Sequence, residues 1–299
     1  MPSILTNASA LTALQNLAST QKNLQTTQNQ ISTGLKVATS ADNSSYWSIA
    51  STMKSDNGAL GAVKTSLAQS SAMLSFTNSA VNNVISVMNQ IKNDLVTAKQ
   101  PGADLAKIGT DITQATKQLT SIVNSSTYSG VNVFDGSTSS LNLVSSFDRD
   151  STGATSVGKI TLSTAALTGT GTGATASSGI LEGGTGTATG SGTDFTALSV
   201  SSSTTSATLD TYIGDADKTL ASLQDYAAKI GATQTRVALQ QSFVSAMSDA
   251  LTNGVSALVD ADMNEASTRL QALQTQQQLG VQSLAIANQN SQMILKLFG

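Results

Sequence analysis

Apolar residues recur at alternating intervals of three and four along both ends of the chain. One such stripe spans residues 60–95, a second spans 105–122, and a third spans 213–258. A mean repeat of 3.5 residues is typical of a coiled-coil seam. Because every seam needs a facing seam, the sequence predicts a mainly α-helical fold. In this predicted fold, segments from both ends of the chain together form discontinuous coiled-coil or helical-bundle domains.

The first two stripes are separated by a short break that contains Pro101 and Gly102. Proline cannot continue the hydrogen-bond ladder of a helix, so the first helix must end here. Asp104 stands where a helix N-cap is expected. The sequence therefore predicts an antiparallel turn between two helices.

The seven-residue frame also slips near the two termini. Five residues separate Leu258 from Met263, where a continuing seam would place four. A slip of this kind changes the local winding of a coiled coil, so we expect a boundary near 259–262 and its counterpart near 34–43. The predicted domains are an inner terminal coiled coil (1–42 and 260–299), a helical-bundle core (43–140 and 206–259) and an outer β-rich variable segment (141–205).

The middle of the chain is rich in Gly, Ser and Thr and lacks the helical repeat. Residues 142–147 and 159–163 read as short strands joined by a turn over 148–153. Residues 169–193 are almost all small, so we expect them to bury little surface. The sequence predicts a small β-rich insertion between the helical ends.

The terminal segments carry more apolar surface than one partner helix can cover. The last segment is apolar nearly all round on a helical wheel, and helices of that kind are buried. Leaving its side chains in water costs about 0.8 kcal/mol per CH₂ group. Packing beneath the chain's own bundle is the alternative, but the frame slip argues against it, so we expect copies of the chain to cover this surface. The residues assigned to subunit assembly are Leu11, Leu14, Leu17, Leu24, Ile31, Leu270, Leu273, Leu279, Leu284, Ile286, Met293, Ile294 and Leu297.

Composition argues against most chemical functions. The chain has no His and no Cys, which removes the commonest general base, the thiol nucleophile and any disulfide. A net charge of -3 does not attract a polyanion, and no apolar run has the length of a membrane span. We expect no enzymatic activity, no cofactor or metal, and no nucleic-acid or membrane partner.

Two near matches to ligand-binding motifs are better explained as turns. The segment 153–159 ends like a phosphate-binding loop, but Ile160 stands where that motif needs a hydroxyl. Asp148 and Asp150 resemble the start of a calcium loop, yet its twelfth position is Lys159 in place of Glu. Both segments are expected to belong to a polar hairpin.

Several motifs resemble the signatures of bacterial flagellins. Ile31-Ser-Thr-Gly-Leu-Lys36 and the following Ala41-Asp-Asn-Ser-Ser-Tyr-Trp-Ser-Ile-Ala50 resemble the N-terminal signature, in a form common among alphaproteobacteria. Gly231-Ala-Thr-Gln-Thr-Arg236-Val237 resembles the C-terminal signature, and residues 260–265 and 287–298 are similar to the family's tail. The signature residues expected at the joint between domains are Asp42, Asn43, Trp47, Arg236, Asp260 and Asp262.

The resemblance implies a structural subunit that polymerises into the helical flagellar filament used for swimming. It implies terminal helices that line a hollow tube, a bundle that forms the outer wall, and an outward-facing middle. It also implies export without a cleavable signal peptide to the extracellular filament. The implied partners are further copies of the chain, other flagellins, an export chaperone, a filament cap and hook-junction proteins.

Two other functions are considered. A hook–filament junction protein would share such termini but be used in few copies. An enzyme or ligand-binding module could occupy residues 141–205, although this segment is short and lacks His. Some flagellins engage an innate immune receptor through a Gln-Arg-x-Arg-Glu-Leu patch. Here Gln90 replaces an Arg and the acid–Leu pair sits one residue late, at Asp94 and Leu95, which argues against such recognition.

Overall fold

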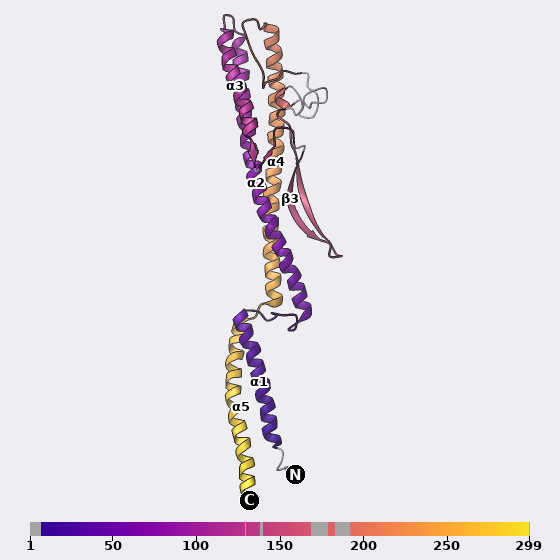
Figure 1. Cartoon of the computed structure of the whole chain (residues 1–299), viewed down its shortest axis with the longest axis vertical. Coiled ribbons are helices and arrows are strands. Elements are labelled where there is room, and N and C mark those ends of the chain that lie inside the picture. The colour runs from indigo at the N-terminus through magenta and orange to yellow at the C-terminus, as the bar shows by residue number, and fades with distance from the viewer. Residues whose placement is uncertain (1–6, 129, 138–139, 169–178, 183–191, 299) are drawn as a thin grey trace. The chain divides into compact units, whose positions relative to one another are not determined.

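Helices dominate the part of the chain that the structure describes, as Figure 1 shows. The computed structural model describes residues 7–128, 130–137, 140–168, 179–182 and 192–298, with side chains up to residue 289. The predicted mainly α-helical fold with a small β insertion is confirmed. The helices are α1 (Ala8–Thr33), α2 (Ser44–Ala98), α3 (Leu105–Ser125), α4 (Ser206–Val259) and α5 (Met263–Phe298).

The chain divides into two compact units. Unit 1 combines Met1–Gly58 with Ser248–Gly299, and unit 2 is Ala59–Met247. Helices α2 and α4 therefore contribute residues to both units. The helices themselves break over 34–43 and 260–262, where the heptad frame slips. The division of the chain into inner, core and outer domains remains a prediction.

The core of unit 2 follows the predicted seam of α2. All positions of the stripe between Leu60 and Leu95 are buried, including the polar Ser70 and Thr77. The two hydroxyls donate hydrogen bonds of 2.8 Å to backbone carbonyls four residues earlier in the helix. Because their polar groups are satisfied inside the helix, these residues pack in an apolar seam without an unpaired donor.

Helices α2 and α4 run antiparallel in unit 2. Lys64 Nζ donates to Ser245 Oγ at 3.3 Å, and further along α2 the Lys92 ammonium pairs with Asp217 at 2.5 Å. As residue numbers rise along α2, those of the partners on α4 fall. The predicted turn after α2 is also present, since Asp104 accepts a hydrogen bond from the Lys107 amide at 3.2 Å and caps α3.

Within the described residues, the strands form two antiparallel hairpins. They are β1 (Thr127–Tyr128) with β2 (Val131–Asn132), and β3 (Ser140–Arg149) with β4 (Thr155–Ser163). The β3–β4 turn is tightened by the Asp150 carboxylate, which accepts hydrogen bonds from the amides of Thr152 and Ala154 at 2.8 and 2.9 Å.

Strand β4 begins earlier than the predicted residue 159, so Gly158 lies within the strand rather than in a loop. A Cβ at Gly158 would stand 2.3 Å from Ser146 Oγ, so a larger residue at this position requires that side chain to move.

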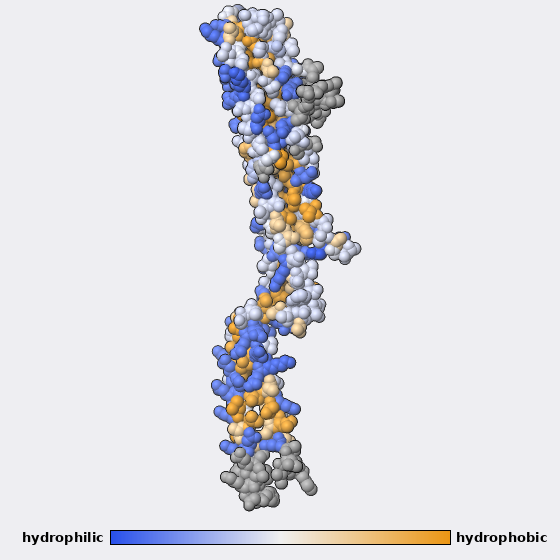
Figure 2. All heavy atoms as spheres, viewed as in Figure 1, coloured by the Kyte–Doolittle hydropathy of each residue, from blue (hydrophilic) through white to orange (hydrophobic). Residues whose placement is uncertain are grey.

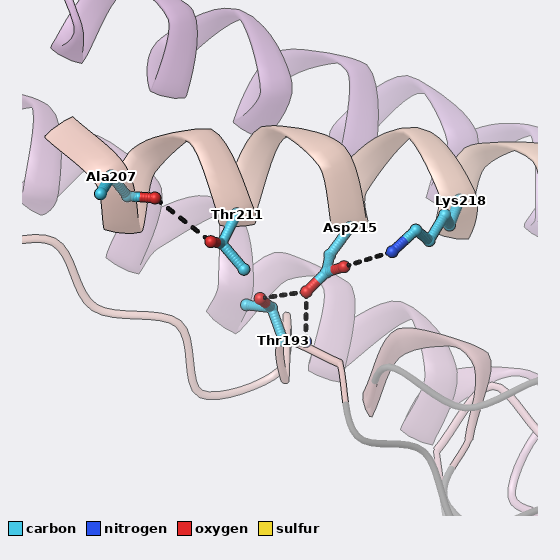
Figure 3. A network of polar contacts seen from close by, with 5 residues as sticks. All are labelled: Thr193, Ala207, Thr211, Asp215 and Lys218. Atoms are coloured by element: carbon cyan, nitrogen blue, oxygen red, sulfur yellow. Dashed lines mark hydrogen bonds and ion pairs between the residues drawn. The ribbon is translucent and has the colours of Figure 1, made fainter.

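The rest of the middle is held by a few long-range contacts. Ile180 and Leu181, in the short 3-10 turn η1 (Ile180–Glu182), are buried. This corrects the expectation that 169–193 buries little surface, although 169–178 and 183–191 lie outside the described residues. Asp215 of α4 accepts hydrogen bonds from the amide and hydroxyl of Thr193 at 3.0 and 2.8 Å, as Figure 3 shows.

Candidate assembly surface

Helices α1 and α5 pack against each other as an antiparallel pair in unit 1 (Figure 1). The positions that are buried or half-buried alternate at intervals of three and four on both helices, as a coiled-coil seam requires. On α1 they are Ala10, Ala13, Leu17, Thr20, Leu24, Thr27 and Ile31, with the half-buried Gln30 next to Ile31; on α5 they are Ala266, Leu270, Leu273, Gln277, Gly280, Leu284 and Ala287.

The pair is fixed at one end by Asn7. Its side-chain oxygen accepts a hydrogen bond from the Ala10 amide at 3.0 Å and so caps α1. Its side-chain nitrogen donates to the Ala287 carbonyl of α5, also at 3.0 Å. One residue therefore starts the helix and sets its alignment with the partner helix.

A short backbone ladder fixes the other end of the pair. Gly34 ends α1 in a left-handed conformation (φ +72°), which glycine adopts at little cost. Its carbonyl accepts a hydrogen bond from the Ala261 amide at 2.9 Å, and the Lys36 amide donates to the Val259 carbonyl at 2.7 Å. These bonds join the segment after α1 to the segment between α4 and α5.

A small apolar cluster lies beside this ladder. Its buried members are Val37, Ala50, Val255 and Val259. They come from the ladder, from the first turns of α2 and from the end of α4. The cluster explains why these stretches of α2 and α4 belong to the same compact unit as the terminal helices.

Polar signature residues lie around the ladder, where they cap helices and tighten turns. The Asp42 carboxylate accepts hydrogen bonds from the Thr39 amide at 2.9 Å and the Ala38 amide at 3.1 Å. The bond from the Thr39 amide is the main cause that lowers the pKa of Asp42. Asn43 accepts from the Tyr46 amide at 3.1 Å, and Asp262 accepts from the Asn264 amide at 2.9 Å. Asn43 and Asp262 thereby cap α2 and α5.

Several apolar side chains of α1 and α5 lie outside the seam and remain exposed. Five of them have exposed fractions above one half, from 54% for Val281 to 61% for Ile286. Figure 2 shows this apolar surface on both terminal helices. These five residues are Leu11, Leu14, Leu279, Val281 and Ile286. A pair of helices covers one stripe on each member and leaves these residues in water.

Comparison with known proteins decides the family. The profile of the bacterial flagellin N-terminal helical region matches residues 4–139, and that of the C-terminal helical region matches 213–298. The chain is 40% identical to flagellin C of Rhizobium meliloti strain 1021 and 43% identical to a flagellin of Brucella melitensis biotype 1. Each alignment covers all of this chain and 99% of the relative. The chain belongs to the bacterial flagellin family.

Membership of the flagellin family confirms the resemblance predicted from the sequence, including its alphaproteobacterial form. It also confirms the predicted function of a structural filament subunit. None of these matches favours the hook–filament junction protein. Flagellin A of Rhizobium meliloti strain 1021 is 35% identical over an alignment that covers the whole of both chains.

The structure places the residues assigned to assembly in two groups. One group lies in the seam between α1 and α5: Leu17, Leu24, Ile31, Leu270, Leu273 and Leu284. The other lies outside the seam and is exposed: Leu11, Leu14, Leu279 and Ile286. The side chains of Met293, Ile294 and Leu297 lie outside the described residues. The part of each residue in assembly remains a prediction.

The residues assigned to the joint are also divided. Asp42, Asn43, Trp47, Asp260 and Asp262 belong to unit 1, whereas Arg236 is an exposed residue of unit 2. Asp260 pairs with Leu35 in the backbone ladder. Trp47, also expected at the joint, is 41% exposed.

Sequence reasoning passed over an exposed apolar row on α4, formed by Leu239, Phe243 and Met247. Their spacing of four was the available signal, but only the buried seam of that helix was predicted. Within the described residues, no cluster of Asp and Glu could hold a metal ion. In the same part of the chain, no helix is long and apolar enough to cross a membrane.

Proposed function

We propose that the exposed apolar residues of α1 and α5 are contacts through which this flagellin polymerises. The observation that carries the proposal is the exposure of Leu11, Leu14, Leu279, Val281 and Ile286 outside a seam that is already paired. Burying one such side chain contributes about 1.5–3 kcal/mol. Association of copies gains this free energy, which the α1–α5 pair alone leaves unused.

The positions of these residues favour a filament over a closed dimer. Leu279 and Ile286 are seven residues apart and share one face of α5, whereas Val281 lies about 200° around the helix from Leu279. Two faces of one helix then need neighbours, in addition to the residues on α1. Contacts of different surfaces on successive copies generate helical filaments when they do not close into a ring.

Membership of the family also supports finer proposals about location and partners. We propose that the chain works outside the cell, in the filament, after export without cleavage of a signal peptide. The terminal helices form its inner layer and the bundle its outer layer. An export chaperone, a filament cap and hook-junction proteins are its proposed partners, and its role is structural rather than catalytic.

The assembly proposal is tested with a Leu279→Gln/Ile286→Gln variant. If these side chains are buried between copies, the loss of even one of them raises the critical concentration for polymerisation about tenfold or more, because 1.4 kcal/mol corresponds to a factor of ten. Subunits and filaments are quantified by sedimentation and electron microscopy after seeding. The far-UV circular dichroism of the subunit should not change, since both residues are exposed before assembly.

A Gln282→Ala variant is the matched control, because Gln282 is an exposed polar residue of the same helix. It should polymerise at the wild-type concentration. If the Leu279→Gln/Ile286→Gln variant did so as well, the exposed apolar residues of α5 would not be assembly contacts.

A further inference from the structure

Two ion pairs join α2 and α4 near one end of unit 2, and they repeat at the heptad interval. Lys92 of α2 pairs with Asp217 of α4 at 2.5 Å, and Lys99, which directly follows α2, pairs with Asp210. The two lysines are seven residues apart, and so are the two aspartates. Because seven residues make two turns of a coiled-coil helix, the two ion pairs lie on the same flank of the seam.

The same flank carries a polar contact far along both helices. Lys64 Nζ donates to Ser245 Oγ at 3.3 Å. The interval from Lys64 to Lys92 on α2 is 28 residues, and the interval from Asp217 to Ser245 on α4 is also 28. Both helices therefore pass through four whole heptads between these contacts, with no shift of one against the other. Within α2 this interval contains no charged residue.

The apolar seam alone does not select this alignment. On both helices the buried seam residues recur at intervals of seven, so a shift of α4 by one heptad again sets apolar residues against apolar residues. The buried residues at this interval are Leu60, Leu67, Leu74, Val81, Met88 and Leu95 on α2 and Ala216, Leu223, Ile230, Val237 and Val244 on α4.

The two ion pairs together distinguish the observed alignment from its neighbours. After a shift of seven residues in one direction, Lys92 faces Asp210, but Lys99 lies beyond the first residue of α4. After a shift in the other direction, Lys99 faces Asp217, but Lys92 faces Gln224. The observed alignment gives an acidic partner to both lysines, whereas either shift leaves one of them without such a partner.

We infer that the pairs Lys92–Asp217 and Lys99–Asp210 form a register lock, which selects the alignment of α2 with α4. The side chains of Lys92 and Asp217 are 34 and 55% exposed, and ion pairs of this exposure contribute little to overall stability. Charges that flank a coiled-coil seam instead determine how the helices align. The lock thereby decides which residues of α2 and α4 lie side by side on the surface of unit 2. This inference concerns the single subunit and does not depend on polymerisation.

The absence of cysteine allows spin labels to report the alignment. A Ser71→Cys/Gln224→Cys variant carries one label on each helix. Position 71 lies one heptad beyond Lys64 and so faces position 238, which is 14 residues from Gln224. This offset is about 21 Å along the helix axis, and a shift of one heptad changes it to about 10 or 31 Å. Electron paramagnetic resonance of the labelled subunit measures the distance.

Reversal of the lysine charges should shift the alignment. In the labelled chain, Lys92→Asp/Lys99→Asp sets like charges against each other in both pairs, and a shift of one heptad relieves one of the two repulsions. We expect a second distance that differs from the wild-type distance by about 10 Å. Adding Asp210→Lys/Asp217→Lys restores opposite charges and should restore the single wild-type distance. If the lysine reversal prevents folding, Lys92→Gln/Lys99→Gln removes the lock without repulsion and should also show the second distance.

A Lys107→Asp/Lys218→Asp variant is the matched control. It makes the same change in net charge, but these lysines pair with Asp104 and Asp215, three residues away in sequence, and do not join α2 to α4. The control should keep the wild-type distance. The inference would be overturned by a wild-type distance in the folded variants that lack the lock. It would also be overturned by a second distance that persists after the charges are exchanged, or by the same second distance in the control.

Discussion

Leu17 of α1 packs against Gly280 of α5, at the point where α5 has no side chain. A Cβ on Gly280 would stand 3.1 Å from Leu17 Cδ1, which is closer than most such contacts. The leucine thus fills the space that the glycine leaves in the seam. This contact fixes the alignment of two helices that are far apart in the sequence.

A large side chain at position 280 should weaken the pairing. Gly280→Leu forces Leu17 out of its place, and overpacking of this kind costs about 1–3 kcal/mol. Gly214→Leu on α4 is the matched control, because a Cβ there meets no atom within 4 Å. Thermal unfolding followed by circular dichroism should show a lower stability for Gly280→Leu than for Gly214→Leu. Equal stability of the two variants would mean that the seam has room at Gly280.

The hydrogen bonds to Asp42 predict a dependence of stability on acid pH. Led by the bond from the Thr39 amide, they lower the pKa of Asp42 from its ordinary value of 3.8. A lowered folded-state pKa contributes stability that is present above the unfolded-state value and is lost as the pH falls through the folded-state value. The wild type should therefore be more stable than Asp42→Asn at neutral pH, and the difference should shrink below pH 3.8. An NMR titration of the Asp42 carboxyl with a midpoint at or above 3.8 would contradict this.

The contact between Asp215 and Thr193 should stabilise unit 2 more than the neighbouring ion pair does (Figure 3). Burial raises the pKa of Asp215, but hydrogen bonds from Thr193 and Lys218 outweigh it, and the net pKa is lowered. Asp215→Ala leaves the Thr193 amide without its acceptor and should cost about 1–3 kcal/mol. Lys218 has an 81% exposed side chain, so Lys218→Ala should cost less than about 1 kcal/mol.

Urea unfolding of the two single variants measures this difference. A double-mutant cycle with Thr193→Ala then isolates the coupling between Asp215 and Thr193. A cost for Lys218→Ala as large as that for Asp215→Ala would show that the ion pair, rather than the Thr193 contact, dominates.

Trp47 offers an optical readout of assembly. It is the only Trp in the chain, and it lies beside the exposed Tyr46 and Ile49 at the start of α2. If neighbouring copies cover this apolar patch, the indole loses water, and its fluorescence should shift to shorter wavelength as filaments form. Acrylamide quenching should decrease in parallel. An unchanged spectrum would place the patch on the filament's solvent-exposed surface.

Much of the helical fold could be predicted from the sequence, because a heptad seam reports burial directly. The stripe from Leu60 to Leu95 is buried throughout. Ser70 and Thr77 interrupt the apolar pattern but satisfy their hydroxyls within the helix, so they do not interrupt the seam. Asp104 was predictable as an N-cap because the preceding Pro101 marks a helix end.

The contacts that join distant segments could not be predicted in this way. The pairing of Leu35 with Asp260 is made by backbone atoms, and no periodicity of side chains specifies it. Ile180 and Leu181 were overlooked because the average composition of residues 169–193 hides two large apolar side chains. The presence of exposed apolar residues on α5 was predictable, since one seam cannot cover this helix. The neighbours that each residue contacts depend on the packing of copies in the polymer.

The hydrogen bond from Asn7 to Ala287 spans 280 residues of sequence. A chain that is synthesised or threaded through a channel from its beginning therefore presents α1 long before α5 arrives. Until then, the seam residues of α1 have no partner helix to pack against, and the alignment of α1 is not fixed. If the two-helix surface makes the subunit contacts proposed above, a fragment that stops short of α5 should be left out of the growing polymer.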